Sequence, residues 1–100
     1  MIRHIVMWKL KEHHDGMSRH ETAVKAKAHL DALRGVVPEI RRIETGVNAI
    51  ESEAAWDLVL SADFDDAAAL ERYQKHPEHV KVAEFIAKIR ESRAVVDYLI

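Results

Sequence analysis

The sequence predicts an α+β domain in which helices pack on one face of a four-stranded antiparallel sheet. Two patterns support this prediction. Apolar and polar residues alternate from Ile2 to Leu10 and from Trp56 to Phe64, which is typical of strands with one buried face. Apolar residues recur at helical spacing from Ala23 to Leu33 and from Val80 to Ile89, which is typical of amphipathic helices. Together with the remaining elements, these segments give the order β-α-β-β-α-α-β of a ferredoxin-like fold.

The first strand is expected from Ile2 to Leu10, and it is apolar on both faces. One face carries Ile2, His4, Val6, Trp8 and Leu10. The other face carries Ile5 and Met7, interleaved with charged residues. A strand of this kind is covered on both sides, or covered on one side and paired with another subunit on the other. We therefore expect the second face to pack on a second copy of the chain in a symmetric homodimer.

The first helix follows a turn at HHDG. Ser18 and Glu21 have the spacing of a capping box that opens a helix, and Gly35 is placed to end it. After the loop at Pro38, a longer and more polar strand is expected from Ile40 to Ile50. A turn then leads to the third strand, whose expected buried face carries Trp56, Leu58, Leu60, Ala62 and Phe64.

The last third of the chain is expected to form two helices and a strand. Asp65 or Asp66 is placed to cap a short helix over Ala67–Lys75. Pro77 fits the first turn of the next helix, where its missing N–H is not needed. A strand rich in β-branched residues, from Arg93 to Ile100, closes the chain.

Length and composition indicate one domain over residues 1–100. A chain of 100 residues builds one core but not two. Its 48% hydrophobic and 32% charged residues are typical of a soluble globular protein. Without cysteine, a signal peptide or an apolar run long enough to span a bilayer, we expect a cytoplasmic protein with no membrane partner. The formal net charge of −2, with basic and acidic residues intermixed, argues against a nucleic-acid partner.

The stretch YQKHPEHVKVAEFI, from Tyr73 to Ile86, brings a phenol and two imidazoles to the junction of two helices. Proton removal beside a carbonyl requires a base within about 3 Å and an oriented donor. We therefore expect Tyr73 and His79 to act as a catalytic pair within hydrogen-bond reach, directly or through one water. His4 is then expected to bind a carbonyl oxygen across the cavity. The alternative is a capped helix junction whose buried tyrosine and histidine have no chemical role.

The walls of this cavity are expected to come from the buried face of the sheet and from the helices. The candidate wall residues are Val6, Trp8, Leu30, Leu58, Leu60, Val82 and Phe85. If these side chains fill the space between sheet and helices, no room is left for a small-molecule ligand.

Neither a metal site nor a cofactor is expected. His76 and His79 have i, i+3 spacing, but zinc needs a third protein ligand that the sequence does not supply. The histidines near Asp15 are better explained as part of a polar, solvated loop. Asp57 and Asp97 are expected to pair with strand arginines, such as Arg3, Arg41 or Arg93.

Five separated segments of the chain resemble the stress-responsive α/β-barrel (Dabb) family in order and spacing: RHIVMWKLK, VVPEIRRIETGVN, WDLVLSADFDD, YQKHPEHVKV and VVDY. The resemblance implies a ferredoxin-like monomer whose sheet packs on the sheet of a partner, giving a dimeric α/β barrel. The family includes plant stress-induced proteins without an accepted activity. It also includes olivetolic acid cyclase, which closes a polyketide ring by an aldol condensation.

The resemblance to the cyclase extends to part of its pocket. Its catalytic tyrosine and histidine match Tyr73 and His79, and a histidine near the start of its first strand matches His4. A further pocket histidine aligns with Leu58 here. Aromatic wall residues of the cyclase align with Ala26, Lys27 and Leu30. The resemblance thus implies the same proton-handling pair in a cavity of different shape, with a different ligand.

Two classes of function follow. The first is an enzyme that acts on a small, apolar carbonyl compound by aldol-type cyclisation or a related proton-abstraction step. The second is a non-catalytic stress-response protein that works as a ligand-binding or structural dimer. The two classes differ in whether a cavity is open to a ligand and whether a bound compound is turned over.

Overall fold

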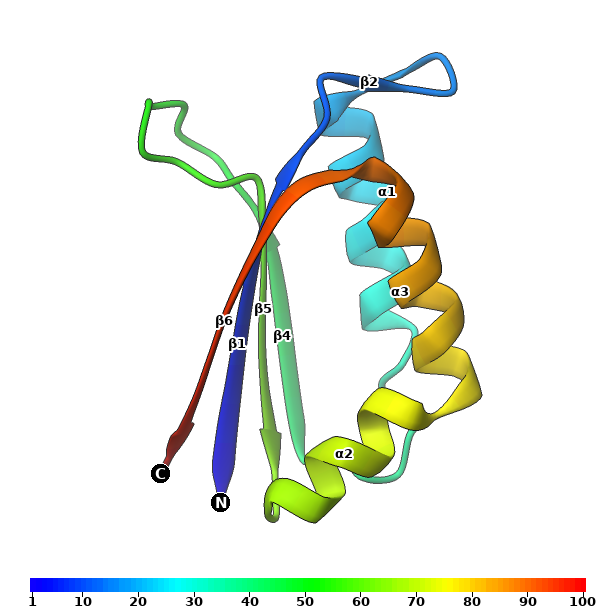
Figure 1. Ribbon diagram of the computed structural model, residues 1–100, viewed down its shortest axis with the longest axis vertical. Coiled ribbons are helices and arrows are strands. Elements are labelled where there is room, and N and C mark those ends of the chain that lie inside the picture. The colour runs from blue at the N-terminus through cyan, green and yellow to red at the C-terminus, as the bar shows by residue number, and fades with distance from the viewer.

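Three helices lie on one face of a four-stranded antiparallel sheet in the computed structural model, which describes residues 1–100 (Figure 1). The strands are ordered β4-β5-β1-β6 across the sheet. Their bounds are Arg42–Val47 for β4, Leu58–Phe64 for β5, Ile2–Leu10 for β1 and Arg90–Leu99 for β6. This architecture confirms the ferredoxin-like α+β fold predicted from the sequence.

The helices begin at the predicted capping residues. Their bounds are Arg19–Asp31 for α1, Ala67–Lys75 for α2 and Pro77–Ile89 for α3. Ser18 and Glu21 form the predicted capping box, in which each side chain accepts from the other's backbone N–H at 3.2 Å. Asp66 caps α2 by accepting from the Ala69 N–H at 2.8 Å, and Pro77 is the first residue of α3. None of the three helices is long and apolar enough to cross a bilayer.

A small hairpin forms where the sequence predicts only a turn. Its strands are β2 (His13–His14) and β3 (Met17–Ser18). Between them, Asp15 and Gly16 have positive φ angles of 48° and 76°. Two successive residues in the left-handed region are typical of the tight turn that best fits the twist of a hairpin. The DG pair was therefore a hairpin signal.

Three strands differ from their predicted extents, and the last of them, β6, begins at Arg90 instead of Arg93. β4 is shorter than predicted, since only 6 residues pair with β5. β5 begins at Leu58, so Trp56 does not lie on its buried face; it lies beside Lys9, whose Nζ is 5.4 Å from the indole centroid. The cause is a contact with β1, because the Asp57 carboxylate accepts from the Leu10 N–H at 2.7 Å and fixes the backbone just before β5 starts.

The helices divide the sheet into a covered face beneath them and an open face on the other side (Figure 1). On the covered face, the register places Val6 opposite Leu60 and Trp8 opposite Leu58, and all four side chains are buried. The cover ends before the edge strand β6. Leu99 of β6 pairs with the first residue of β1, yet its side chain is 80% exposed.

The open face carries apolar side chains between charged ones, as the sequence predicts. Met7 and Val59 lie opposite each other and are each 38% exposed, and Ile5, two residues before Met7 on β1, is half-buried. β6 adds Val96 and Tyr98, both exposed. A single chain therefore leaves this apolar surface in contact with solvent.

Candidate functional site

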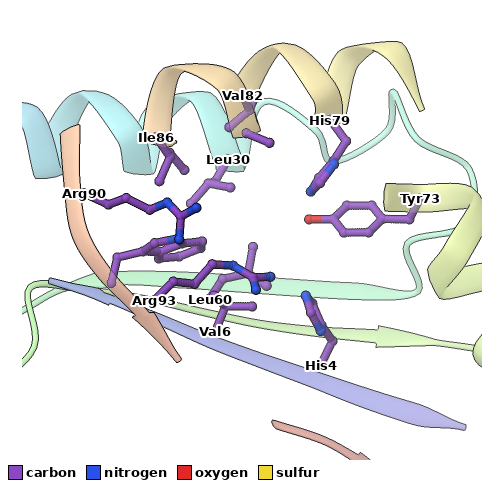
Figure 2. A pocket seen from close by; sticks show the side chains of 12 residues that line it. His4, Val6, Leu30, Leu60, Tyr73, His79, Val82, Ile86, Arg90 and Arg93 are labelled. Atoms are coloured by element: carbon purple, nitrogen blue, oxygen red, sulfur yellow. The ribbon is translucent and has the colours of Figure 1, made fainter. Parts of the chain in front are cut away.

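A cavity of about 100 Å³ lies between the covered face and the helices (Figure 2). The predicted site residues that line it are His4, Val6, Trp8, Leu30, Leu60, Tyr73, His79 and Val82. The lining is completed by Ala83 and Ile86 of α3 and by Arg90 and Arg93 of β6. The predicted wall residues therefore do not fill the space between sheet and helices.

Leu58 and Phe85, which the sequence predicts in the cavity wall, lie outside it. Leu58 is buried opposite Trp8 at the start of β5, beyond the end of the cavity. Phe85 precedes Ile86 on α3, and one residue turns a helix by about 100°. Its ring therefore faces α1, where it packs edge-on against His29 with ring centroids 5.2 Å apart.

The bend between α2 and α3 aims two of the predicted residues into the same space. His76 has extended backbone angles, φ −62° and ψ 133°, and serves both as the C-cap of α2 and as the N-cap of α3. Its Nδ1 accepts from the Glu78 N–H at 3.1 Å. The capped-junction interpretation thus holds for His76, while Tyr73 before the bend and His79 after it face the cavity (Figure 2).

Tyr73 is almost entirely buried near the end of α2. Its ring packs on Phe64 and His79, with centroids 4.7 and 4.4 Å apart, and its hydroxyl points into the cavity (Figure 2). Burial raises the pKa of Tyr73 well above its usual value, and the positive charge of Arg93 opposes this only in part. The phenol stays protonated at neutral pH and is a hydrogen-bond donor toward the cavity.

His79 reaches the cavity from the first turn of α3. Its Nδ1 lies 3.0 Å from the carbonyl oxygen of Gln74, which can only accept, so Nδ1 carries the proton and Nε2 keeps its lone pair. Burial lowers the pKa of His79, and the nearby His4 and Arg93 act in the same direction. The ring is therefore a neutral base at neutral pH, packed on Tyr73 without a direct hydrogen bond to it.

His4 approaches from the sheet side of the cavity and is 2% exposed. Its Nδ1 lies 2.5 Å from Oδ1 of Asp97, the residue opposite it on β6. Because a carboxylate only accepts, this nitrogen carries the proton, and Nε2 is left to exchange a proton with a ligand. The ring centroid of His4 is 6.3 Å from that of Tyr73. His4, Tyr73 and His79 therefore meet at one cavity from three different elements.

The role of Asp97 differs from the sequence interpretation, in which it pairs with a strand arginine. The carboxylate that binds strand arginines is Asp63, which accepts from Arg3 and Arg42 on the open face. The sequence interpretation also missed Arg90 and Arg93 as cavity residues. The register of β1 with β6 is the signal that identifies these contacts, because it places Asp97 opposite His4 and Arg93 opposite Trp8.

The structure gathers no group of three or more His, Cys, Asp or Glu side chains that is arranged to hold a metal ion. The two cavity histidines come from opposite walls, and each has its Nδ1 bound to a protein acceptor. The cavity therefore brings together two imidazoles and one phenol.

This fold and this cavity define a class of protein: a ferredoxin-like α+β domain with a cavity between its sheet and its helices that two histidines and a tyrosine line. The sequence matches the Stress Responsive A/B Barrel Domain family (Dabb) over residues 2–100, and the chain belongs to this family.

Several known proteins are similar to this chain. An uncharacterized protein of Streptomyces coelicolor is 39% identical over 80 residues, which cover 79% of this chain and 79% of that protein. A dimeric protein of unknown function with a ferredoxin-like fold, from Bacteroides fragilis, superposes with a TM-score of 0.87 at 32% identity, covering 99% of this chain and 95% of that chain. The hydroxynitrile lyase of Passiflora edulis superposes with a TM-score of 0.80 at 20% identity, covering 99% and 92%.

Proposed function

We propose that this protein moves a proton beside the carbonyl group of a small, largely apolar compound, in an aldol-type ring closure or a related lyase step. One observation carries the proposal. Two imidazoles whose Nδ1–H groups are held by Asp97 and by the Gln74 carbonyl share one cavity with the protonated hydroxyl of Tyr73. Base, second proton carrier and hydrogen-bond donor are thus available to one bound molecule.

The three groups have complementary tasks in such a reaction. The neutral His79 takes the proton from the carbon beside the carbonyl at its Nε2. The electron pair of that C–H bond forms the C=C bond of the enolate while the π pair of the carbonyl moves onto its oxygen, and the Tyr73 hydroxyl donates a hydrogen bond to the enolate oxygen that forms. The enolate carbon then attacks a second carbonyl, whose oxygen receives a proton from an imidazole. That proton is the one that His79 has taken from carbon, and it returns either directly from His79 or by way of the Nε2 of His4, which Asp97 orients.

The Passiflora edulis hydroxynitrile lyase supports the lyase variant at the level of the fold, since it is a lyase with this architecture. The substrate walls must be argued from this chain alone. Their apolar part is aliphatic apart from Trp8 and includes Val6, Leu60 and Ile86, and Arg90 and Arg93 border one end. At about 10–15 Å³ for each water-sized group, a cavity of about 100 Å³ holds a ligand of roughly seven to ten non-hydrogen atoms. The substrate class is therefore small.

We also propose that the open face pairs with the open face of a second copy, which gives the dimeric α/β barrel. Met7, Val59, Val96 and Tyr98 are exposed on this face, and the similar Bacteroides fragilis protein is a dimer. A stable interface of this kind buries about 800 Å² per partner. Because the cavity lies on the covered face, each protomer keeps its own site.

The proposal is tested by following proton exchange at the carbon beside the carbonyl, in D₂O, by NMR with a panel of small ketones and keto acids. Wild type is compared with Tyr73→Phe and His79→Ala. Loss of a general base or donor lowers a rate typically by about 10²- to 10⁴-fold. Both variants should keep the fold, since neither changes the aliphatic core.

His76→Ala is the matched control, because His76 lies three residues from His79 and caps α3 from outside the cavity. It should lower the melting temperature and slow exchange only slightly, far less than Tyr73→Phe or His79→Ala. The pH profile adds a second check. Because the pKa of His79 is lowered, the neutral base persists below the ordinary histidine value of about 6.5, and the rate should fall only at more acidic pH. If no compound exchanges, and Tyr73→Phe and His79→Ala differ from wild type only in melting temperature, the non-catalytic dimer is the correct function.

A further inference from the structure

Two arginines at the cavity lack any acceptor from the protein. The chain has eight arginines. Six of them donate to a carboxylate or a backbone carbonyl: Arg3, Arg19, Arg34, Arg41, Arg42 and Arg72. The remaining two, Arg90 and Arg93, form no side-chain hydrogen bond or ion pair, and both line the cavity. The unmatched guanidinium groups of the molecule are therefore gathered at one place.

The two guanidinium groups lie across the cavity from the phenol and the imidazoles. Figure 2 shows Arg90 and Arg93 extending into the cavity from the side opposite Tyr73 and His79. The positive charge of Arg93 reaches the far side, since it acts to lower the pKa of both Tyr73 and His79. The acidic residue on the same side of β6 is Asp97, and its carboxylate is taken by His4. No protein carboxylate is thus left to neutralise the pair.

An anionic group of the ligand fits this arrangement. Two positive groups at one cavity wall repel each other, and a carboxylate between them removes that repulsion. The guanidinium fork also matches a carboxylate in geometry, so that two parallel N–H···O bonds form, each assisted by charge. We propose that Arg90 and Arg93 bind the carboxylate of the substrate, so that the site takes short keto acids in preference to neutral ketones. This inference builds on the proposed function, because it names the substrate class of the same site.

The spacing of the groups limits the length of the acid. Arg93 lies opposite Trp8, and Asp97 lies opposite His4, so four strand residues separate the arginine from the imidazole. Four residues span about 13 Å along a strand. The extended arginine side chain covers part of that distance. We therefore expect an acid whose carboxylate and carbonyl are separated by one or two carbons.

The experiment compares two acids with their neutral esters: acetoacetate with methyl acetoacetate, and levulinate with methyl levulinate. Dissociation constants are measured by NMR titration of wild type, Arg90→Gln, Arg93→Gln and Arg41→Gln. The acid should bind more tightly than its ester to wild type. Each cavity substitution should raise the dissociation constant of the acid by about 10- to 100-fold and leave that of the ester unchanged. Arg41→Gln makes the same charge change at an exposed arginine paired with Asp65, and it should leave both ligands unchanged.

The inference is wrong if an ester binds as tightly as its acid, or if no probe binds at all. It is also wrong if Arg41→Gln and Arg93→Gln weaken binding of the acid equally, or if a cavity substitution weakens the dimer without weakening binding of the acid. The inference and the proposed function fail separately. If the acids bind through the arginines but exchange no protons, the carboxylate site stands and the proposed reaction is wrong. If the esters exchange protons in a Tyr73-dependent way and the acids bind no better, the reaction stands and the carboxylate site is wrong.

Discussion

The two faces of the sheet share one alternation of residues but differ in how their charges are matched. On the open face, the Asp63 carboxylate accepts from Arg3 at 2.8 and 3.0 Å and from Arg42 at 2.9 Å. On the covered face, Arg93 has no acceptor, and His79 is held neutral by burial. Matched charges satisfy one another and fix the structure. Unmatched groups around a cavity are available to a ligand.

The cavity exists because the helices cover only part of the sheet. α2 and α3 meet at the His76 bend, and α3 passes directly into the edge strand β6 (Figure 1). The end of the cavity near β6 is therefore bordered by two long side chains, Arg90 and Arg93, instead of a helix. No helix lies over the open face, so its apolar groups stay exposed unless a partner surface covers them.

The largest effect is expected on the open face, where Val59→Asp should convert a dimer into monomers. A carboxylate buried without a partner at an interface costs several kcal/mol. The dissociation constant of the dimer should therefore rise by about 100-fold or more, as measured by light scattering over a concentration series. The substituted side chain is 38% exposed in a single chain, so the monomer itself should remain folded.

Val24→Asp is the control for this change, because Val24 is exposed on α1, away from the open face. It should leave the dimer intact. A monomeric wild type at micromolar concentration, or equal dissociation of both variants, would show that the open face is not the interface and would remove the asymmetry between the two faces.

The next effect separates the roles of charge on the two faces. Asp63→Asn removes the carboxylate that holds Arg3 and Arg42, and it should lower the free energy of unfolding by about 2 kcal/mol in a urea titration. Asp97→Asn instead changes the partner of His4, and it should lower the proton-exchange rate with little change in stability. If Asp97→Asn lowers stability and Asp63→Asn does not, the charges of the covered face stabilise the fold and the interpretation of the two faces is wrong.

The pH dependence of stability gives the sign of the Asp63 contribution. The two guanidinium groups hold the pKa of Asp63 well below its usual range. An aspartate in the unfolded chain titrates near 3.9, so the unfolded state binds more protons as the pH falls below about 4. The stabilisation is present above that value and is lost as the pH falls toward the folded-state pKa. Asp63→Asn should be less sensitive to pH across this acid window.

The faces of the sheet were predictable from sequence because side-chain direction in a strand depends only on alternation. Ile5, Met7 and Val59 lie on the open face as predicted, and the caps at Ser18 and Asp66 form as predicted. These features depend on residues that are close in sequence, so that local pattern is sufficient.

The contacts that give the cavity its charge were not predicted, because they depend on register between strands far apart in sequence. The pair of His4 and Asp97 is separated by 93 residues. The side chains of Arg90 and Arg93 enter the cavity because the helices on the covered face do not extend over β6. The local sequence pattern does not show how far the helices extend across the sheet. Trp56 was misplaced for a related reason, since the Asp57 contact with β1 interrupts the alternation.

The smallest effect is expected at the connection between β5 and α2, where the chain passes from the sheet to the helices that cover it. Two adjacent aspartates act differently there: Asp66 accepts from the Ala69 N–H at 2.8 Å and caps α2, whereas Asp65 forms an exposed ion pair with Arg41. Removing a helix cap costs about 1 kcal/mol, because a backbone donor of the first turn loses its acceptor. An exposed ion pair contributes little, since water and salt screen it.

Asp66→Ala should therefore lower the melting temperature measurably, and it should also slow proton exchange slightly by loosening the helix that carries Tyr73. Asp65→Ala should do neither. Equal melting temperatures for the two variants would mean that α2 is held by its packing on the covered face and not by its cap.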